Sequence, residues 1–210
     1  IVDTKKKAND LCKYYNCYEK KVDVIPLTPN ITEKINYQNY TCSPELNTFF
    51  QKSKEYFFYP AQYWSHKNHF YILSVLDKLK KEYDKKIYFV FTGNKKNNYT
   101  FLKSKVTEMS LLDQVVFFDY LSNNDIKYLY KNCKALIMPS LVGYSSLPLY
   151  EAFYFEKPVF YTKNLLDQSL IKYVNEIDID DEYSLIEQII NFDKNEKEIL
   201  EKVKLAKIYF

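Results

Sequence analysis

The sequence is poor in cysteine, and the few cysteines that it has are not placed to bind a metal. Cys12, Cys17, Cys42 and Cys133 form no Cys-x-x-Cys pair, and none lies beside a histidine. Structural zinc sites need four ligands, usually cysteines and histidines at short spacings, so a zinc site is not expected. The thiols are expected to stay reduced, as they do in cytoplasmic proteins.

Long apolar runs and a leader segment are also missing. No segment approaches the roughly 20 apolar residues that a membrane-spanning helix needs. The first residues, IVDTKKKAND, lack the long apolar core of a signal peptide. The chain begins without a methionine and inside what reads as continuing structure, so we expect it to be a piece of a longer protein.

Net charge and glycine content are low as well. The 30 basic and 27 acidic side chains leave a net charge of +3, which is too small to predict a nucleic-acid partner without a clustered patch. Two glycines against 22 tyrosines indicate a bias in genome composition rather than a structural device. At 210 residues and 25.3 kDa, the chain can form one domain with an appendage, but not two full nucleotide-binding domains.

What is present is a regular alternation of strand and helix patterns. Apolar runs of strand length and amphipathic segments follow one another with short joins, which predicts a parallel sheet with right-handed crossovers. The predicted fold is therefore a doubly wound, Rossmann-like α/β sheet with an N-terminal appendage. Strands are predicted at 21–27, 56–59, 87–91, 115–118, 135–138, 159–161 and 174–179, and helices at 10–18, 67–83, 99–109, 124–132, 148–157, 165–173, 182–192 and 196–209.

The stretch from residue 134 to residue 161, KALIMPSLVGYSSLPLYEAFYFEKPVFY, reads as strand, polar loop, helix and strand. Pro148 suits the first helical position, with a preceding serine as the cap. A helix N-terminus after a parallel strand points unpaired N–H groups into the crevice at the strands' carboxyl ends, where phosphate binds readily. Glu151, one turn further, could accept hydrogen bonds from the hydroxyl pair of a ribose. A glutamate there also stabilises the helix dipole without any ligand.

The same stretch resembles the donor-site signature of retaining GT-B glycosyltransferases of family 4, the group 1 sugar transferases. In that family a strand ending in proline leads through a loop into a Pro-x-x-Glu-Ala helix start, and a Lys/Thr-Pro-Val strand follows. The matching positions here are Pro148, Glu151, Ala152, Lys157, Pro158 and Val159. The family carries a second glutamate eight positions earlier, which contacts the donor sugar, and this sequence departs from the pattern there with Gly143.

The loop after the strand predicted at 56–59 resembles the family's Gly-Arg, four residues, Lys segment, whose two cations hold the donor diphosphate. Lys67 matches the lysine, whereas Ala61 and Gln62 replace the glycine and the arginine. A glutamine can still donate a hydrogen bond to phosphate, but without charge assistance. Lys67 is therefore expected to carry most of the neutralisation. A solvated surface lysine is the alternative interpretation.

The two histidines, His66 and His69, are three positions apart near the start of a predicted helix and could share one of its faces. No third acidic or cysteine ligand accompanies them at a suitable spacing, so metal binding is not expected. A hydrogen bond from His66 to the diphosphate or to a sugar hydroxyl is the favoured functional hypothesis.

Two further loops follow predicted strands and complete the expected site. Gly93 permits a tight turn after a buried strand, and the resemblance places it near the nucleotide. The resemblance also places Tyr120 and Leu121 against the nucleobase, although a buried aromatic is the favoured interpretation of Tyr120. The expected donor-binding residues are therefore Gln62, His66, Lys67, Gly93, Tyr120, Leu121, Gly143, Tyr144, Ser145, Ser146, Leu147 and Glu151.

The resemblance implies a nucleotide-sugar-dependent hexosyltransferase that retains the anomeric configuration and needs neither a metal nor another cofactor. Its donor domain would span residues 56–193, with the end of an acceptor domain and a linker at 1–55 and a C-terminal helix at 194–210. No catalytic residue can be named, because the resemblance puts any acceptor-side residue upstream. The acceptor would be a glycan or a lipid-linked molecule in surface polysaccharide or glycoconjugate synthesis, in the cytoplasm or at the inner face of the membrane.

Two other functions stay open at this point. A sugar-nucleotide-binding module without turnover is favoured by Gln62 and Gly143, which stand where the family has charged residues. A GT-B sugar-nucleotide epimerase would share the fold and the phosphate site. It needs acid and base carboxylates within the cleft, however, and Asp119 and Glu151 are poor candidates for those roles.

Overall fold

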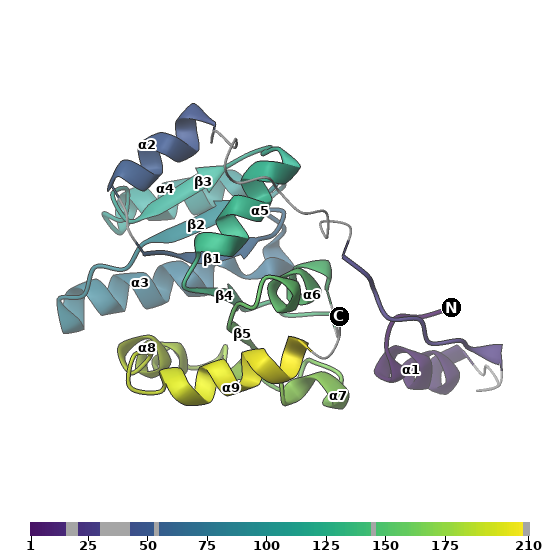
Figure 1. The fold of residues 1–210 in the computed structure, drawn as a ribbon. Coiled ribbons are helices and arrows are strands. Elements are labelled where there is room, and N and C mark those ends of the chain that lie inside the picture. Colours follow the sequence, from purple (N-terminus) through teal and green to yellow (C-terminus); the bar gives the residue numbers. More distant parts are fainter. Residues whose placement is uncertain (16–20, 30–42, 53–54, 144–145, 208–210) are drawn as a thin grey trace.

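The computed structural model describes residues 1–15, 21–29, 43–52, 55–143 and 146–207 (Figure 1). Six parallel strands form one sheet in the order β3-β2-β1-β4-β5-β6, so the prediction of a doubly wound parallel sheet is confirmed. The strands are β1 Phe57–Pro60, β2 Phe89–Thr92, β3 Val115–Phe118, β4 Ala135–Met138, β5 Val159–Thr162 and β6 Asn175–Ile177. From β1 the chain adds β2 and β3 on one side, and it then returns to add β4, β5 and β6 on the other side, so the strand order switches between β1 and β4. Ligands of such sheets bind outside the carboxyl ends of the strands at this switch point.

The four central strands are apolar because both of their faces are covered. Figure 1 shows α3 and α4 on one side of the sheet and α5 and α6 on the other. Residues of β2, β4 and β5 are buried throughout, and those of β1 are buried up to its last residue. A strand without a solvent face has no reason to alternate polar and apolar residues. This is why short apolar runs located these strands to within two residues.

The helices begin where side-chain caps or proline permit. Ser122 opens α5 by accepting a hydrogen bond from the Asp125 N–H at 3.1 Å, which satisfies a donor of the first turn. Asp181 opens α8 in the same way by accepting from the Tyr183 N–H at 2.9 Å. The helices of the described residues are α1 Lys5–Tyr15, α2 Pro44–Lys52, α3 His69–Tyr83, α4 Tyr99–Glu108, α5 Asn123–Asn132, α6 Leu147–Tyr154, α7 Gln168–Ile171, α8 Glu182–Ile190 and α9 Glu196–Ala206.

The predictions for the N-terminal segment need correction. The helix predicted at 10–18 begins earlier, at the first residue of α1, and its predicted end lies outside the described residues. The strand predicted at 21–27 is not formed. Val24 makes only an isolated parallel bridge with Val2, flanked by the hydrogen bonds Val2 N–H to Asp23 O and Ile25 N–H to Val2 O. An apolar run forms a strand only where a neighbouring strand is available to pair with it. None of the six strands of the main sheet pairs with this segment.

Part of the segment predicted as a linker is helical. Helix α2 buries Leu46 and Phe49 in the core of the sheet domain. The Phe49 ring packs edge-on against Tyr56 at 5.5 Å and Phe118 at 6.4 Å between ring centroids. This helix therefore shares the core of the sheet although it precedes β1. The other parts of the predicted linker, 30–42 and 53–54, lie outside the described residues.

The helix predicted at 165–173 is much shorter in the structure. Leu166 is buried before the helix begins, and Asp167 caps α7 by accepting from the Ser169 N–H at 3.0 Å. Across the described part of the chain, no helix combines the length and the apolar character needed to cross a bilayer.

Candidate nucleotide-binding site

Two neighbouring cavities open at the carboxyl ends of the strands. The first, here called the β1–α6 cavity, has a volume of about 370 Å³ and lies at the switch point of the sheet. Its walls are Tyr59, Pro60, Ala61, Gln62, Trp64, His66, Lys67, Met138, Ser146 and Pro148. The second, the β2–β3 cavity, has about 240 Å³ and is lined by Pro60, Ala61, Gln62, Thr92, Gly93, Asn94, Asp119, Tyr120, Leu121 and Ile126. The two cavities share the turn that follows β1, so one elongated ligand could occupy both.

Lys67 lies in a turn rather than in the helix predicted for it. Residues Ser65–Lys67 form a 3₁₀ turn, Asn68 adopts a left-handed conformation with φ 54° and ψ 39°, and α3 begins only at His69. Asparagine tolerates this conformation better than most residues. The Tyr59 hydroxyl donates to the Lys67 carbonyl at 3.1 Å. The backbone that carries the Lys67 side chain into the cavity is therefore held from the end of β1.

The Lys67 ammonium is half-buried, and burial lowers its pKa below the ordinary lysine value. None of the ion pairs found among the described residues involves it. The sequence contains no arginine, so every permanent cation near the cavity is a lysine. A partly desolvated ammonium without a carboxylate partner favours an anionic ligand, because such a ligand would stabilise the charged form.

Gln62 is oriented by its neighbour Trp64. The Trp64 indole N–H donates to the Gln62 Oε1 at 3.0 Å, and the Lys96 ammonium lies 5.3 Å from the centroid of the indole ring. Because an indole N–H can only donate, it must face the amide oxygen, and this leaves the Gln62 amide NH₂ free to donate elsewhere. Sequence reasoning identified Gln62 but missed Trp64. The two residues are only two positions apart in one loop, and this spacing could have indicated a contact between their side chains.

The opposite wall of the β1–α6 cavity is the N-terminus of α6. Ser146 occupies the cap position, although its side chain makes no cap hydrogen bond, and Leu147 is the first helical residue. Pro148 lacks an N–H, and the Leu149 N–H bonds to the Ser146 carbonyl at 3.1 Å. The Leu147 N–H therefore remains as a donor of the first turn. The Leu141 N–H donates to the His66 carbonyl at 2.8 Å and ties the two walls together.

Three further residues were expected in the loop before α6: Gly143, Tyr144 and Ser145. Tyr144 and Ser145 lie outside the described residues. The carbonyl of Gly143 accepts a hydrogen bond from the Tyr161 hydroxyl at 3.1 Å, and Gly143 is not among the residues that line either cavity. The structure thus brings Gln62, Lys67 and Ser146 together and leaves Gly143 apart from them.

Gly93 is explained by a close approach of two loops. A β-carbon at this position would lie 2.6 Å from the carbonyl oxygen of Ala61 and 2.8 Å from the Gln62 Cα, which is too close for any side chain. The Gly93 N–H donates to the Phe118 carbonyl at 3.2 Å. Gly93 therefore sets the position of the loop that carries Gln62, besides lining the β2–β3 cavity itself.

The favoured interpretation of Tyr120 as a buried aromatic is wrong. Its side chain is 84% exposed, at the mouth of the β2–β3 cavity. β3 ends at the buried Phe118, and the two residues that follow it, Asp119 and Tyr120, are both exposed in the loop. Leu121 is half-buried in the same cavity. An exposed ring beside a cavity is available for stacking on a planar ligand.

The two histidines do not share a face. His66 is exposed and lines the β1–α6 cavity, whereas His69 is fully buried between the rings of Tyr59, Tyr63 and Phe91 at centroid distances of 4.9, 5.2 and 5.1 Å. Burial lowers the pKa of His69 to about 3, so it is neutral at physiological pH. Within the described residues no three His, Cys, Asp or Glu side chains are grouped so as to hold a metal ion.

Glu151 lies on α6 outside both cavities, partly buried. Its Oε2 accepts a hydrogen bond from the Tyr130 hydroxyl at 2.5 Å. Burial raises the pKa of the Glu151 carboxyl, and the bond from Tyr130 opposes that rise. Sequence reasoning missed Tyr130, because nothing in a strand–helix pattern tells which residue of α5 meets which residue of α6.

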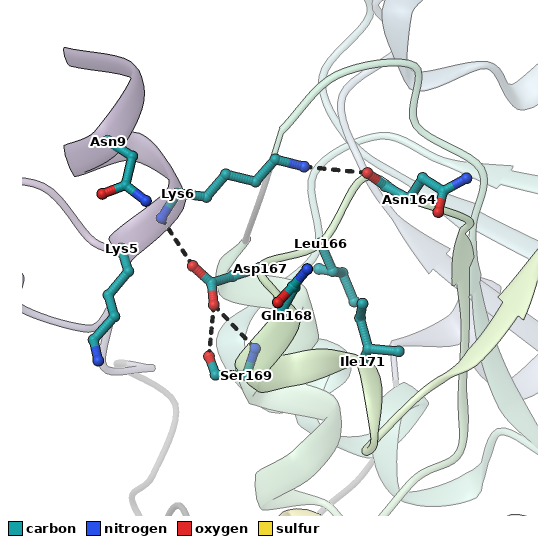
Figure 2. A pocket seen from close by; sticks show the side chains of 9 residues that line it. All are labelled: Lys5, Lys6, Asn9, Asn164, Leu166, Asp167, Gln168, Ser169 and Ile171. Atoms are coloured by element: carbon teal, nitrogen blue, oxygen red, sulfur yellow. Dashed lines mark hydrogen bonds between the residues drawn. The ribbon is translucent and has the colours of Figure 1, made fainter. Parts of the chain in front are cut away.

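A larger cavity, of about 540 Å³, lies elsewhere, between α1 and α7 (Figure 2). It contains none of the expected donor-binding residues. Figure 2 shows the Asp167 carboxylate between the two helices, accepting from the Lys6 N–H at 2.9 Å and from the Ser169 hydroxyl at 2.8 Å. This carboxylate joins the N-terminal helix to the sheet domain.

The family of the chain is shown by its sequence. A family model described as Glycosyl transferases group 1 matches residues 47–204. The matched range begins within α2 and includes both cavities. No curated protein has a sequence that matches the chain at a significant level.

Solved structures share the fold at low sequence identity. WaaG, a glycosyltransferase involved in lipopolysaccharide biosynthesis, has a TM-score of 0.76 and 17% identity over 99% of this chain and 57% of its own. Anabaena Alr3699/HepE in complex with UDP-glucose has a TM-score of 0.77 and 13% identity, with 99% and 57% covered. A glycosyltransferase from Rickettsia africae has a TM-score of 0.73 and 20% identity, with 96% and 56% covered. The chain therefore has the Rossmann-like fold of one part of these GT-B proteins and spans a little over half of their length.

Proposed function

Because this chain belongs to the family of group 1 glycosyl transferases, we propose that it is the donor-binding part of an enzyme that transfers a hexose from a nucleoside-diphosphate sugar to an acceptor. One observation carries this proposal. Gln62, Lys67 and the N-terminus of α6 line a single cavity at the switch point of the sheet. A cation, an amide donor and a helix N-terminus facing one space are suited to a diphosphate.

The same groups have a role in the reaction. As the bond between sugar and diphosphate breaks, negative charge develops on the departing nucleoside diphosphate. In this proposal the ammonium of Lys67 and the Leu147 N–H stabilise this charge, and interactions that strengthen in the transition state raise the rate. We assign the neutralisation to these groups rather than to a divalent cation, and activity should therefore survive chelation with EDTA.

The nucleoside is assigned to the β2–β3 cavity and its surroundings. The exposed ring of Tyr120 would stack on the base, with Leu121 beneath it, and Glu151 would accept hydrogen bonds from the ribose hydroxyls. Uridine is the first base to test, since the Anabaena structure is described as a complex with UDP-glucose.

The finer parts of the proposal rest on the family signature. Retention of the anomeric configuration and membership of family 4 are proposed from the Pro-x-x-Glu-Ala helix start at Pro148. An acceptor that is a glycan or lipid-linked, and a place in surface polysaccharide synthesis at the inner face of the membrane, are proposed from the same resemblance. The description of WaaG supports this direction.

The test of the site is the binding of UDP, GDP and ADP to this chain, measured by calorimetry, with Lys67→Met as the variant. Losing a hydrogen bond from a charged group costs about 1.5–3 kcal/mol, so the affinity of the best nucleotide should fall at least tenfold. Lys80→Met is the matched control, because the Lys80 ammonium lies further along α3 and donates to the Ser110 carbonyl at 2.8 Å. Equal affinities for the two variants would refute the site.

Turnover is tested with the full-length protein, by following sugar release and transfer from UDP-, GDP- and ADP-sugars. Transfer to an acceptor supports the enzyme. Nucleotide binding without any turnover would instead favour a binding module, to which the glycine at 143 points because no carboxylate stands there to hold the sugar. Interconversion of the donor sugar without transfer would identify an epimerase.

A further inference from the structure

The hydrogen bond between Tyr130 and Glu151 joins a buried residue of α5 to α6, the helix whose N-terminus borders the β1–α6 cavity. Tyr130 is fully buried on α5. Its ring stacks on Phe155 at 5.3 Å with an interplanar angle of 10°, and it meets Phe58 edge-on at 5.1 Å. A phenol enclosed in this way has a fixed hydroxyl position, and that hydroxyl donates to the Glu151 Oε2 at 2.5 Å.

The bond acts on the charge of Glu151 as well as on its position. Burial raises the pKa of the Glu151 carboxyl, whereas the bond from Tyr130 lowers it and so favours the carboxylate. Burial also raises the pKa of Tyr130 well above the ordinary tyrosine value, and the negative charge of Glu151 adds to that rise. Tyr130 therefore remains a protonated donor at neutral pH. Only one carboxylate oxygen is used, which leaves Oε1 free to accept from a ligand.

We propose that Tyr130 is a positioning residue for the donor nucleotide: it orients the Glu151 carboxylate and keeps it ionised, so that the free oxygen accepts hydrogen bonds from the ribose hydroxyls. This inference rests on the proposed function, because it needs a nucleotide in the site. It adds a residue of α5 to a site otherwise formed by loops and by α6. It also gives a reason for the hydrogen bond from the buried Tyr130 hydroxyl to the Glu151 carboxylate.

The experiment compares UDP with its 2′,3′-dideoxy analogue, which lacks the hydroxyls that Glu151 would bind. Tyr130→Phe removes one oxygen from a packed ring and should lower the affinity for UDP about tenfold, because a hydrogen bond to a charged group is lost and its partner is left poorly oriented. The affinity for the dideoxy analogue should stay within twofold of the wild-type value. The preference for UDP is a ratio within each variant, so a general loss of folded protein cancels.

A matched control is a second buried tyrosine, just before β1, that donates to the same helix. The buried Tyr56 hydroxyl donates to the carbonyl of Leu129, on α5, at 2.9 Å. Tyr56→Phe should therefore change stability without changing the preference for UDP over the analogue. In a Glu151→Gln background, Tyr130→Phe should have little further effect on that preference, because a residue that acts through another loses its effect when the other is removed.

The pH dependence distinguishes positioning from simple packing. The preference for UDP requires the carboxylate, so it should be lost as the pH falls through the pKa of Glu151. Without Tyr130 that pKa rises further, so the acid limb of the preference should move to higher pH in Tyr130→Phe and stay in place in Tyr56→Phe. The phosphate of UDP titrates in the same range, but the analogue carries the same phosphate, and the ratio removes its effect.

Each outcome decides between the claims. Equal losses for UDP and the analogue, or an unmoved acid limb in Tyr130→Phe, would overturn the role of Tyr130 while leaving the nucleotide site intact. A wild-type chain that binds UDP but shows no preference over the analogue would overturn both the ribose role of Glu151 and the role of Tyr130. Failure to bind any nucleotide would overturn the proposed function and this inference together.

Discussion

At the scale of single residues, we propose that an oriented amide acts in place of the arginine of the family signature. Gln62 stands where the signature has a cation, and Trp64 takes its carbonyl oxygen in a hydrogen bond of 3.0 Å. A free glutamine presents oxygen or nitrogen to a phosphate with similar ease, and the oxygen is repelled. The indole removes that ambiguity, so part of what the missing charge would supply is recovered by orientation.

Trp64→Phe tests this arrangement, because it removes the indole N–H and keeps an aromatic ring under Lys96. We expect the affinity for UDP to fall about threefold to tenfold, the range of one neutral hydrogen bond. In a Gln62→Ala background the same substitution should have no effect on UDP binding. The readout is a double-mutant cycle measured by calorimetry, and additive losses would mean that Trp64 contacts the ligand directly.

At the scale of elements, one carboxylate serves two helices. Asp167 caps α7 through the Ser169 N–H and also accepts from the Lys6 N–H at the start of α1. Burial would raise the pKa of Asp167, but these hydrogen bonds outweigh burial and hold the pKa below the ordinary aspartate value. The carboxylate form is thus the one that binds α1 to the sheet domain (Figure 2).

Asp167→Ala should release α1. Hydrogen exchange of the amides in residues 5–15 is expected to become at least several times faster, because the loss of a helix cap costs about 0.5–2 kcal/mol. Asp181→Ala is the matched control, since it removes the cap of α8 through the Tyr183 N–H and leaves α1 untouched. Equal exchange of α1 in both variants would show that other contacts hold this helix.

The same contact has a defined pH dependence. A carboxyl whose pKa is depressed by folding stabilises the folded arrangement above its ordinary pKa, and the contribution is lost as the pH falls through the depressed value. The protection of α1 should therefore be constant from neutral pH down to about pH 4, near the ordinary value for aspartate, and should decrease below it. In Asp167→Ala the protection of α1 should lack this step.

Elements were predicted well where local pattern and tertiary environment agree. β4 occurs at the residues predicted, because a strand buried by helices on both faces is an uninterrupted apolar run. β3 does so as well, since its run is equally apolar although this edge strand is only partly buried. The segment 21–27 carries a similar pattern but forms no strand, since a strand needs a partner. The position of Lys67 was mistaken for a helix start, because a left-handed residue such as Asn68 leaves no mark in an apolar pattern.

At the scale of the whole molecule, the order of the strands creates the site. The chain enters the sheet at β1, moves out to β3 and returns to β4 beside β1. Residues from distant parts of the sequence therefore line one cavity at the carboxyl ends of the central strands, some from 59–67 and others at Met138, Ser146 and Pro148. A ligand that fills it joins the two halves of the sheet, and binding should stabilise the whole domain.

UDP should accordingly raise the melting temperature of the chain. At 100 times its dissociation constant a ligand adds about 2.7 kcal/mol, and each kcal/mol raises the melting temperature of a domain of this size by roughly 2–4 °C. We expect a rise of about 5–10 °C, measured by calorimetry or by fluorescence. Uridine at the same concentration should give a much smaller rise. An equal effect of uridine would argue that the diphosphate is not what the β1–α6 cavity binds.

The sequence by itself determined the class of the fold and the family signature, because apolar runs, caps and the Pro-x-x-Glu-Ala helix start are properties of neighbouring residues. It also indicated Gln62, Lys67 and Ser146 as residues of one site. Only the tertiary structure decided that Tyr130 meets Glu151, that Trp64 orients Gln62 and that Tyr120 faces solvent. Those facts depend on how helices and loops pack across the sheet, and side-chain contacts between distant segments have no local signal in the order of the residues.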